Sequence, residues 1–258
     1  MRSLATCAIV AAAAATSANA MVSVIDWSVD GSLSPLVNGQ QLTDSSGSIF
    51  DFGTLFTMTT TGNNRGATVF DSSETGPNNP GPDLDLLAGI GNLVMLQTSS
   101  GSANGNQTTP GIFDNPNDSA AGGEYTLDFD NPTELVSIDL VDVDDGNAIF
   151  VTLTDANGLT RTYDVPNMWT GEPVINGMSD GFGSLLLLDA NDQAGPGGTT
   201  AIFAEDAGYD ASQVASLHID FDGSGGWGNL RFVGIVPAPG TMALAFVGFG
   251  IAGVRRRR

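Results

Sequence analysis

The chain alternates hydrophobic and polar residues over short stretches, most clearly in the segment 124–130, EYTLDFD. There Tyr125, Leu127 and Phe129 share one parity, and the polar residues share the other. A period of two is typical of an antiparallel strand with one buried face. The same pattern recurs in four further segments, at 136–140, 149–153, 159–165 and 217–221.

Other elements are expected where apolar and β-branched residues gather between turn residues. The segment 92–97, NLVMLQ, is apolar on both parities, which predicts a strand covered on both faces. DANG at 155–158 predicts a hairpin turn, and Asp210 is the expected cap of one helical turn at 211–215. The remaining expected strands lie at 22–27, 49–60, 68–70, 185–188, 201–204 and 230–235.

Many short strands without any long helical period predict an all-β fold. We expect a two-sheet antiparallel sandwich of the jelly-roll-like type. The polar residues 98–123 are expected to form one long loop, and the glycine-rich residues 223–228 to connect two strands. Since no internal repeat is visible, the sequence predicts a single domain over residues 21–236.

Residues 1–20 have the pattern of a secretory signal peptide. One positive charge precedes an apolar stretch, and the small residues Ala18 and Ala20 form an A-x-A cleavage pattern. We therefore expect cleavage after Ala20. The exported domain would then cover residues 21–236, and the single cysteine, Cys7, would leave with the signal peptide.

The last residues, 237–258, read PAPGTMALAFVGFGIAGVRRRR. The apolar run from Thr241 to Val254 has 14 residues. As a helix it would cover roughly 21 Å, less than the ~30 Å hydrocarbon core of a bilayer. It is followed at once by four arginines, Arg255, Arg256, Arg257 and Arg258. This predicts a short hydrophobic helix that anchors the chain initially, with the arginines in the cytoplasm.

The proline joint, the glycine-rich apolar segment and the arginines together resemble the PEP-CTERM sorting signal of bacterial exosortase substrates. The residues that correspond to the sorting motif are Pro237, Ala238 and Pro239, with Ala238 in place of the family's glutamate. The resemblance covers under a tenth of the chain. It implies export by the secretion machinery, recognition by an exosortase-like enzyme, and a final place in the cell envelope or outside the cell.

The exported part is strongly acidic. All 29 acidic residues fall within residues 21–236, against Arg65, Arg161 and Arg231, so the formal charge of this part is 3 − 29, or −26. The chain contains no lysine. Such a surface repels phosphates, which excludes nucleic acid as a partner. Two interpretations of the acidic residues stay open, a solubilising coat and calcium binding.

Calcium binding is a chemical possibility because carboxylate oxygens are the ligands that Ca²⁺ prefers. The candidate metal ligands gather at one strand end and in the loop before the segment 92–97. They are Asp139, Asp142, Asp144 and Asp145 at the strand end, and Asp83 and Asp85 in the loop. The spacing does not follow the EF-hand pattern.

Catalysis has little support in the sequence. The single histidine, His218, falls on the predicted solvent face of a strand, and no nucleophile motif accompanies it. Trp169 and Trp227 lie in glycine-rich segments, where exposed indole rings would stack on sugars; core burial is the alternative. We therefore expect a non-catalytic surface or matrix protein that binds calcium, polysaccharide or both. The alternative is a secreted carbohydrate-active enzyme, either a glycoside hydrolase or a lyase, because carboxylate pairs are plentiful.

Overall fold

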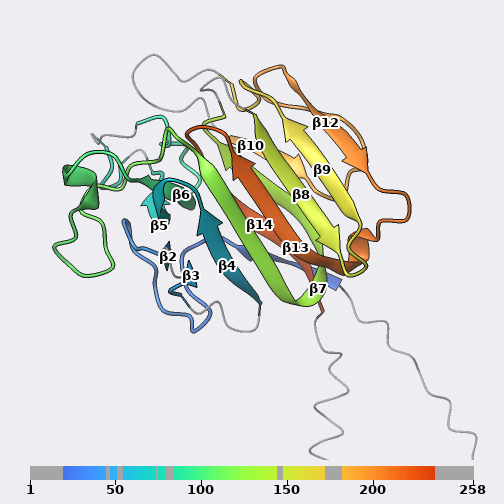
Figure 1. Ribbon diagram of the computed structural model, residues 1–258, viewed down its shortest axis with the longest axis horizontal. Coiled ribbons are helices and arrows are strands. Elements are labelled where there is room, and N and C mark those ends of the chain that lie inside the picture. The colour runs from blue at the N-terminus through green and yellow to red at the C-terminus, as the bar shows by residue number, and fades with distance from the viewer. Residues whose placement is uncertain are drawn as a thin grey trace, which may run out of the picture. The chain divides into compact units, whose positions relative to one another are not determined.

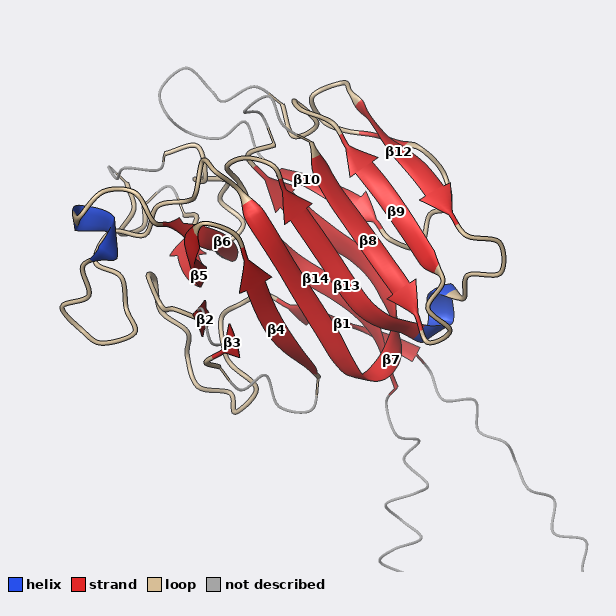
Figure 2. Ribbon diagram, in the orientation of Figure 1, coloured by secondary structure: helices blue, strands red, loops and turns tan. Residues whose placement is uncertain are grey.

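The computed structural model describes residues 20–44, 47–50, 55–73, 75–79, 84–143, 148–171 and 182–235. Residues 22–233 form one compact unit, built from strands and two single-turn 3₁₀ helices (Figure 2). The helices are η1 (Ala103–Gly105) and η2 (Ala211–Gln213). The strands are β1 (Ala20–Ile25), β2 (Thr43–Asp44), β3 (Gly47–Ser48), β4 (Phe56–Thr61), β5 (Asn64–Asp71), β6 (Asn92–Thr98), β7 (Gly123–Val141), β8 (Ile149–Asp155), β9 (Thr160–Val165), β10 (Phe182–Leu186), β11 (Gln193–Ala194), β12 (Thr200–Glu205), β13 (Val214–Phe221) and β14 (Gly226–Ile235).

Apart from β2 and β3, which pair with each other in a separate hairpin, the strands form two antiparallel sheets that share β7. The first sheet has the order β4-β7-β13-β8-β9-β12-β11, and most of its strands are seen side by side in Figure 1. The second has the order β10-β7-β14-β6-β5, with β1 also paired to β14. The all-β, two-sheet antiparallel sandwich predicted from the sequence is therefore confirmed.

Strand β7 passes from one sheet to the other. Its first half pairs with β4 and β13, and its second half pairs with β10 and β14. The register on β13 jumps from Asp128 to Thr133, so the intervening residues make no ladder pair there. Pro132 lies in this gap, where its missing N–H costs no ladder hydrogen bond. The sequence predicted two separate strands here, at 124–130 and 136–140, whereas one bent strand joins the sheets.

The main hydrophobic core lies between the two sheets and contains all three tryptophans. A second, smaller cluster covers the opposite face of the second sheet. Its members are Phe70, Leu86, Leu87, Leu93, Met95 and Val141. Strand β6 contributes Val94 and Leu96 to the first core and Leu93 and Met95 to the second. The prediction of a strand covered on both faces is thus confirmed.

Local expectations were met at the turns and less well at the strand ends. The hairpin after β8 is confirmed, with the Asp155 side chain accepting from the backbone N–H groups of Asn157 and Leu159. Asp210 caps η2 by accepting from the Ser212 N–H. Between β6 and β7 only η1 interrupts the predicted loop. The predicted strand 49–60 is shorter, since β4 begins at Phe56.

Candidate functional site

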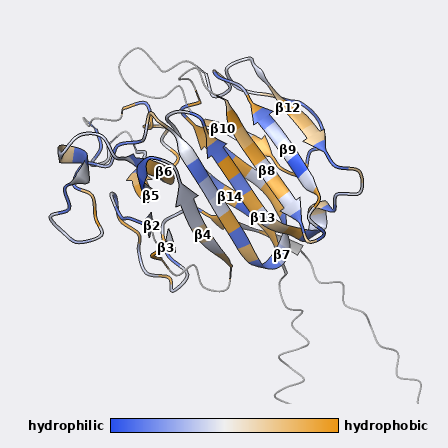
Figure 3. Cartoon of the chain, viewed as in Figure 1, coloured by the Kyte–Doolittle hydropathy of each residue, from blue (hydrophilic) through white to orange (hydrophobic). Residues whose placement is uncertain are grey.

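The outer face of the first sheet carries three aligned rows of mostly polar side chains. The hydropathy alternation along these strands is visible in Figure 3. The central row crosses six strands and comprises Thr59, Thr126, His218, Thr152, Thr162 and Ala204. The flanking rows are Thr57, Asp128, Ser216, Thr154 and Thr160 on one side, and Thr61, Glu124, Asp220, Phe150, Asp164 and Ile202 on the other. All of these residues are partly or fully exposed, and we call them the threonine face.

The threonine face is wide and rigid. Neighbouring strands lie about 4.8 Å apart, and same-face residues repeat about every 6.7 Å along a strand. Six strands and three rows therefore present polar groups over an area of about 24 by 13 Å. Because every member stands on a paired strand and none on a loop, the groups are held in fixed relative positions.

Hydrogen bonds within the face orient several of its side chains. The Thr61 hydroxyl donates to Glu124 Oε2 at 2.7 Å. The hydroxyls of Thr152 and Thr162 lie 3.0 Å apart, and the hydroxyl of Thr126 lies 3.2 Å from His218 Nδ1. A hydroxyl has one donor and two acceptor positions, so each keeps capacity for a ligand.

Two carboxylates on adjacent strands oppose each other in the face. Asp220 and Glu124 are directly paired across β13 and β7. Burial raises the pKa of Asp220 above its ordinary value, and the charge of Glu124 raises this pKa further. His218 acts in the opposite direction, and Asp222 adds to the increase. Like charges directly opposite each other in a sheet are destabilising, so the sequence maintains an unfavourable pair here.

Removing one of these charges should stabilise the protein. We expect Asp220→Asn to raise the free energy of unfolding by about 0.2–1 kcal/mol at neutral pH. A carboxyl group whose pKa is raised by folding destabilises the folded state only where it is ionised. The gain should therefore disappear below the unfolded pKa of about 3.9. Urea unfolding measures the change in stability. The control is Asp128→Asn, which should not show this gain, because the ladder neighbours of Asp128 are the uncharged Thr57 and Ser216. Destabilisation at pH 7 would contradict the interpretation.

Phe150 gives the face an apolar platform. Its side chain is 39% exposed and stands between Asp220 and Asp164 in one row. Ile202 on β12, 52% exposed, pairs with Asp164 of β9 and ends this row. An exposed aromatic ring surrounded by oriented hydroxyl and carboxylate groups combines stacking with hydrogen bonding. Ligand sites commonly have this composition.

The prediction that Trp169 and Trp227 present exposed rings to sugars is wrong. Their exposed fractions are 1% and 0%. The Trp227 ring meets Trp27 edge to face, with centroids 4.9 Å apart. The Trp169 indole N–H donates to the carbonyl of Gln193, and its ring packs so tightly on Gly183 that a Cβ there would overlap it. The glycines near Trp169 that suggested an exposed loop therefore make room for a buried ring.

Asp139 is not the calcium ligand that the sequence predicted. It is fully buried on the outer side of the second sheet, where Arg231 approaches both of its carboxylate oxygens, at 2.9 and 3.2 Å. Asn229 donates to Oδ2 at 2.8 Å, and the Ser184 hydroxyl donates to Oδ1. Both oxygens are thus occupied by donors of the chain itself.

Of the other predicted metal ligands, the structure describes only Asp142 and Asp85. Asp142 is buried directly after β7, with a φ of 59°, and its backbone carbonyl lies beside Gly225. Asp85 lies before β6, while Asp83, Asp144 and Asp145 fall outside the described residues. Within the described ranges, no three acidic, histidine or cysteine side chains are grouped closely enough to hold a metal ion. Calcium binding stays a prediction.

The predicted signal peptide and the predicted sorting tail fall almost wholly outside the described residues. Of the predicted cleavage pair, Ala18 lies outside them and Ala20 is the first residue of β1. The sorting motif Pro237, Ala238 and Pro239 and the terminal arginines 255–258 also lie outside. In the part of the chain that the structure describes, we find no helix of the length and hydrophobicity needed to cross a membrane.

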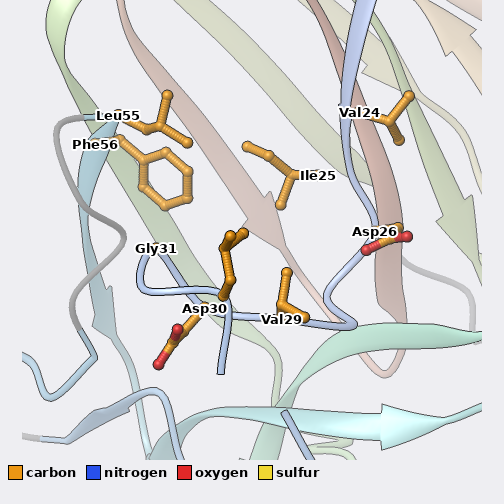
Figure 4. A pocket seen from close by; sticks show the side chains of 9 residues that line it. Val24, Ile25, Asp26, Val29, Asp30, Gly31, Leu55 and Phe56 are labelled. Atoms are coloured by element: carbon orange, nitrogen blue, oxygen red, sulfur yellow. The ribbon is translucent and has the colours of Figure 1, made fainter. Parts of the chain in front are cut away.

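An apolar hollow of about 220 Å³ lies beside β1. Ile25, Val29 and Phe56 point into it, while the carboxylates of Asp26 and Asp30 point away (Figure 4). Serine side chains and backbone N–H groups hold both carboxylates and lower their pKa values. The hollow offers few polar groups to orient a ligand, so the threonine face is the stronger candidate site.

Sequence reasoning placed His218 on a solvent face, which is confirmed, but missed Phe150 and the aligned threonines. Thr57, Thr59 and Thr61 alternate with the core residues of β4, which could have indicated a polar outer face. Their alignment with other strands was not, because it depends on the order of strands in the sheet.

Comparison with known protein families finds no family model that matches the chain, and comparison with curated proteins finds no match. The function must therefore be argued from the site.

Proposed function

We propose that this chain is an exported protein of a bacterial envelope that acts at the cell surface or in the extracellular matrix, by binding and not by catalysis. The ligand proposed for its β-sandwich is an extracellular polysaccharide. The observation that carries the proposal is the threonine face, a broad array of oriented hydroxyls and carboxylates around the exposed ring of Phe150.

The chemistry of the face suits a polysaccharide better than other polymers. Sugar hydroxyls both donate and accept hydrogen bonds, and so do threonine hydroxyls, while carboxylates accept strongly. The apolar side of a sugar ring can cover Phe150. A flat surface of about 24 by 13 Å accommodates an extended chain, and the acidic charge disfavours nucleic acid.

The ends of the chain support the proposed location. The pattern of residues 1–20 favours export by the secretion machinery, and that of residues 237–258 favours sorting by an exosortase-like enzyme. A membrane contact through the tail would hold the domain outside the cell, where polysaccharides are found. Calcium remains a second proposed ligand, now without Asp139, on the acidic residues near Asp142.

Polysaccharide binding should depend on Phe150. We expect Phe150→Ala to weaken binding about tenfold, because covering an exposed phenylalanine contributes roughly 1–2 kcal/mol. Co-sedimentation with insoluble polysaccharides, followed by titration with the polymer that is retained, measures the affinity. The matched control is Phe182→Ala, which removes an equally exposed ring, 39%, from β10 of the second sheet.

Equal loss of binding in the two variants would contradict a site on the first sheet. Release of reducing or unsaturated sugars during the same incubation would favour the alternative, a carbohydrate-active enzyme. Retention of the polymer without any turnover supports a binding module.

A further inference from the structure

The arginines of the exported part are all engaged away from the threonine face. Arg161 points to the core side of β9, where it pairs with Glu205 and packs on Phe203 and Tyr209. Arg231 pairs with Asp139 on the second sheet. Arg65 donates to the backbone carbonyls of Thr98 and Ser99. Because these three arginines are engaged elsewhere and the chain has no lysine, residues 21–236 supply no arginine or lysine to neutralise the carboxylates of the face.

The face nevertheless carries four carboxylates, on three of its strands. They are Glu124, Asp128, Asp164 and Asp220. Its one base, His218, interacts with Asp220, and no arginine lies in the three rows. Positive charge that neutralises these carboxylates when a ligand is bound must therefore come from the ligand.

We infer that the polysaccharide bound by the threonine face carries protonated amino groups, so that its class is a polymer of partly or fully deacetylated amino sugars. This inference rests on the proposed function. Charge complementarity selects a cationic polymer over a neutral one, and it excludes polyuronates and sulfated polymers, whose charges would meet carboxylates.

The spacing of the carboxylates favours a polymer over one metal ion. Asp164 lies two strands from Asp220, about 10 Å away, and Asp128 lies two rows from Glu124, about 13 Å away. A calcium ion binds oxygens at about 2.4 Å, so a single ion cannot serve all four groups. Amines repeated along a polymer can approach each of them.

The opposed pair formed by Glu124 and Asp220 fits the same inference. Like charges in a direct cross-strand pair cost stability, yet simple amide replacements would remove that cost. A cationic group from a ligand would relieve it as well. Residues kept at the expense of stability are typical of functional sites.

The test compares two polymers with the purified full chain. One is a soluble β-linked glucosamine polymer, and the other is the same polymer after N-acetylation, which removes the charge and keeps the rings. We expect the amine form to bind at least about tenfold tighter at low ionic strength, since several weak ion pairs act together. The preference should largely collapse near 1 M salt, where the screening length is about 3 Å.

A pair of variants distinguishes the face from the overall charge, because residues 21–236, with a formal charge of −26, attract any polycation. Glu124→Gln should lower affinity for the amine polymer about two- to fivefold and affinity for the acetylated polymer by a smaller factor, because the glutamine side chain still accepts hydrogen bonds. Glu134→Gln makes the same change on the same strand, where β7 pairs with the second sheet, and should alter neither. Glu124→Gln should not lower the melting temperature, because it removes a like charge, and Asp220→Asn serves as a second variant.

Equal losses in the two glutamine variants would overturn the assignment to the face. Equal affinity for the two polymers, with dependence on Phe150 retained, would overturn the inference and leave the proposed function standing. Failure of the chain to bind any polysaccharide would overturn both.

Discussion

Replacing Arg231 with methionine should lower the free energy of unfolding by about 3 kcal/mol, because it leaves the carboxylate of Asp139 buried without its charged partner. Asp139 is 0% exposed, whereas the Arg231 side chain is 32% exposed. The expected loss is at the lower end of the range for broken buried pairs, since Asn229 and Ser184 continue to donate to the carboxylate. Urea unfolding gives the loss as a shift of the midpoint at constant slope.

Two controls separate this effect from a simple loss of side-chain contacts. The described hydrogen bonds of Arg65 go to backbone carbonyls. Arg65→Met should therefore lower the free energy of unfolding by only about 1 kcal/mol. Adding Asp139→Asn to Arg231→Met removes the uncompensated charge and should recover part of the lost stability. A loss below about 0.5 kcal/mol in Arg231→Met would mean that Asp139 does not need its partner.

The class of fold could be predicted because an alternation with a period of two records which residues a sheet buries. Leu217, Ile219 and Phe221 of β13 show it, as do the residues of β8. The order of strands could not be predicted from such patterns. β13 inserts between β7 and β8, which are consecutive in the chain, and local periodicity carries no information on that long-range pairing. The threonine face depends on this insertion, because β13 places His218 between Thr126 and Thr152.

The misplaced candidate residues share another cause. Trp169 and Asp139 were assigned by residue type and local composition, yet tertiary partners decide their roles. Gly183 of β10 accommodates the Trp169 ring, and Arg231 reaches Asp139 from 92 residues away. A carboxylate cluster in sequence shows neither which members are paired nor which face water. Phe150 was missed for the opposite reason, since an isolated phenylalanine on the polar parity of a strand looks like an exception to the pattern.

Deleting Thr241 to Arg258 should move the protein from the membrane fraction to the medium. The truncation removes the apolar run and the arginines that are proposed to hold the chain in place. It should not disturb the sandwich, because β14 ends at Ile235 and all the described strands are kept. Cell fractionation before and after deletion gives the distribution, and the secreted form should melt at the same temperature as the full chain.

A second variant shows which part of the tail acts. Replacing the four arginines 255–258 with glutamine keeps the length and the apolar run but removes the positive charge that stops transfer across the membrane. If the short apolar run of roughly 21 Å relies on these charges, this variant should also lose much of its membrane association. Unchanged membrane association of the deletion variant would show that the tail is not the anchor. Loss of the deletion variant by degradation, with no folded protein in the medium, would contradict the independence of the sandwich from the tail.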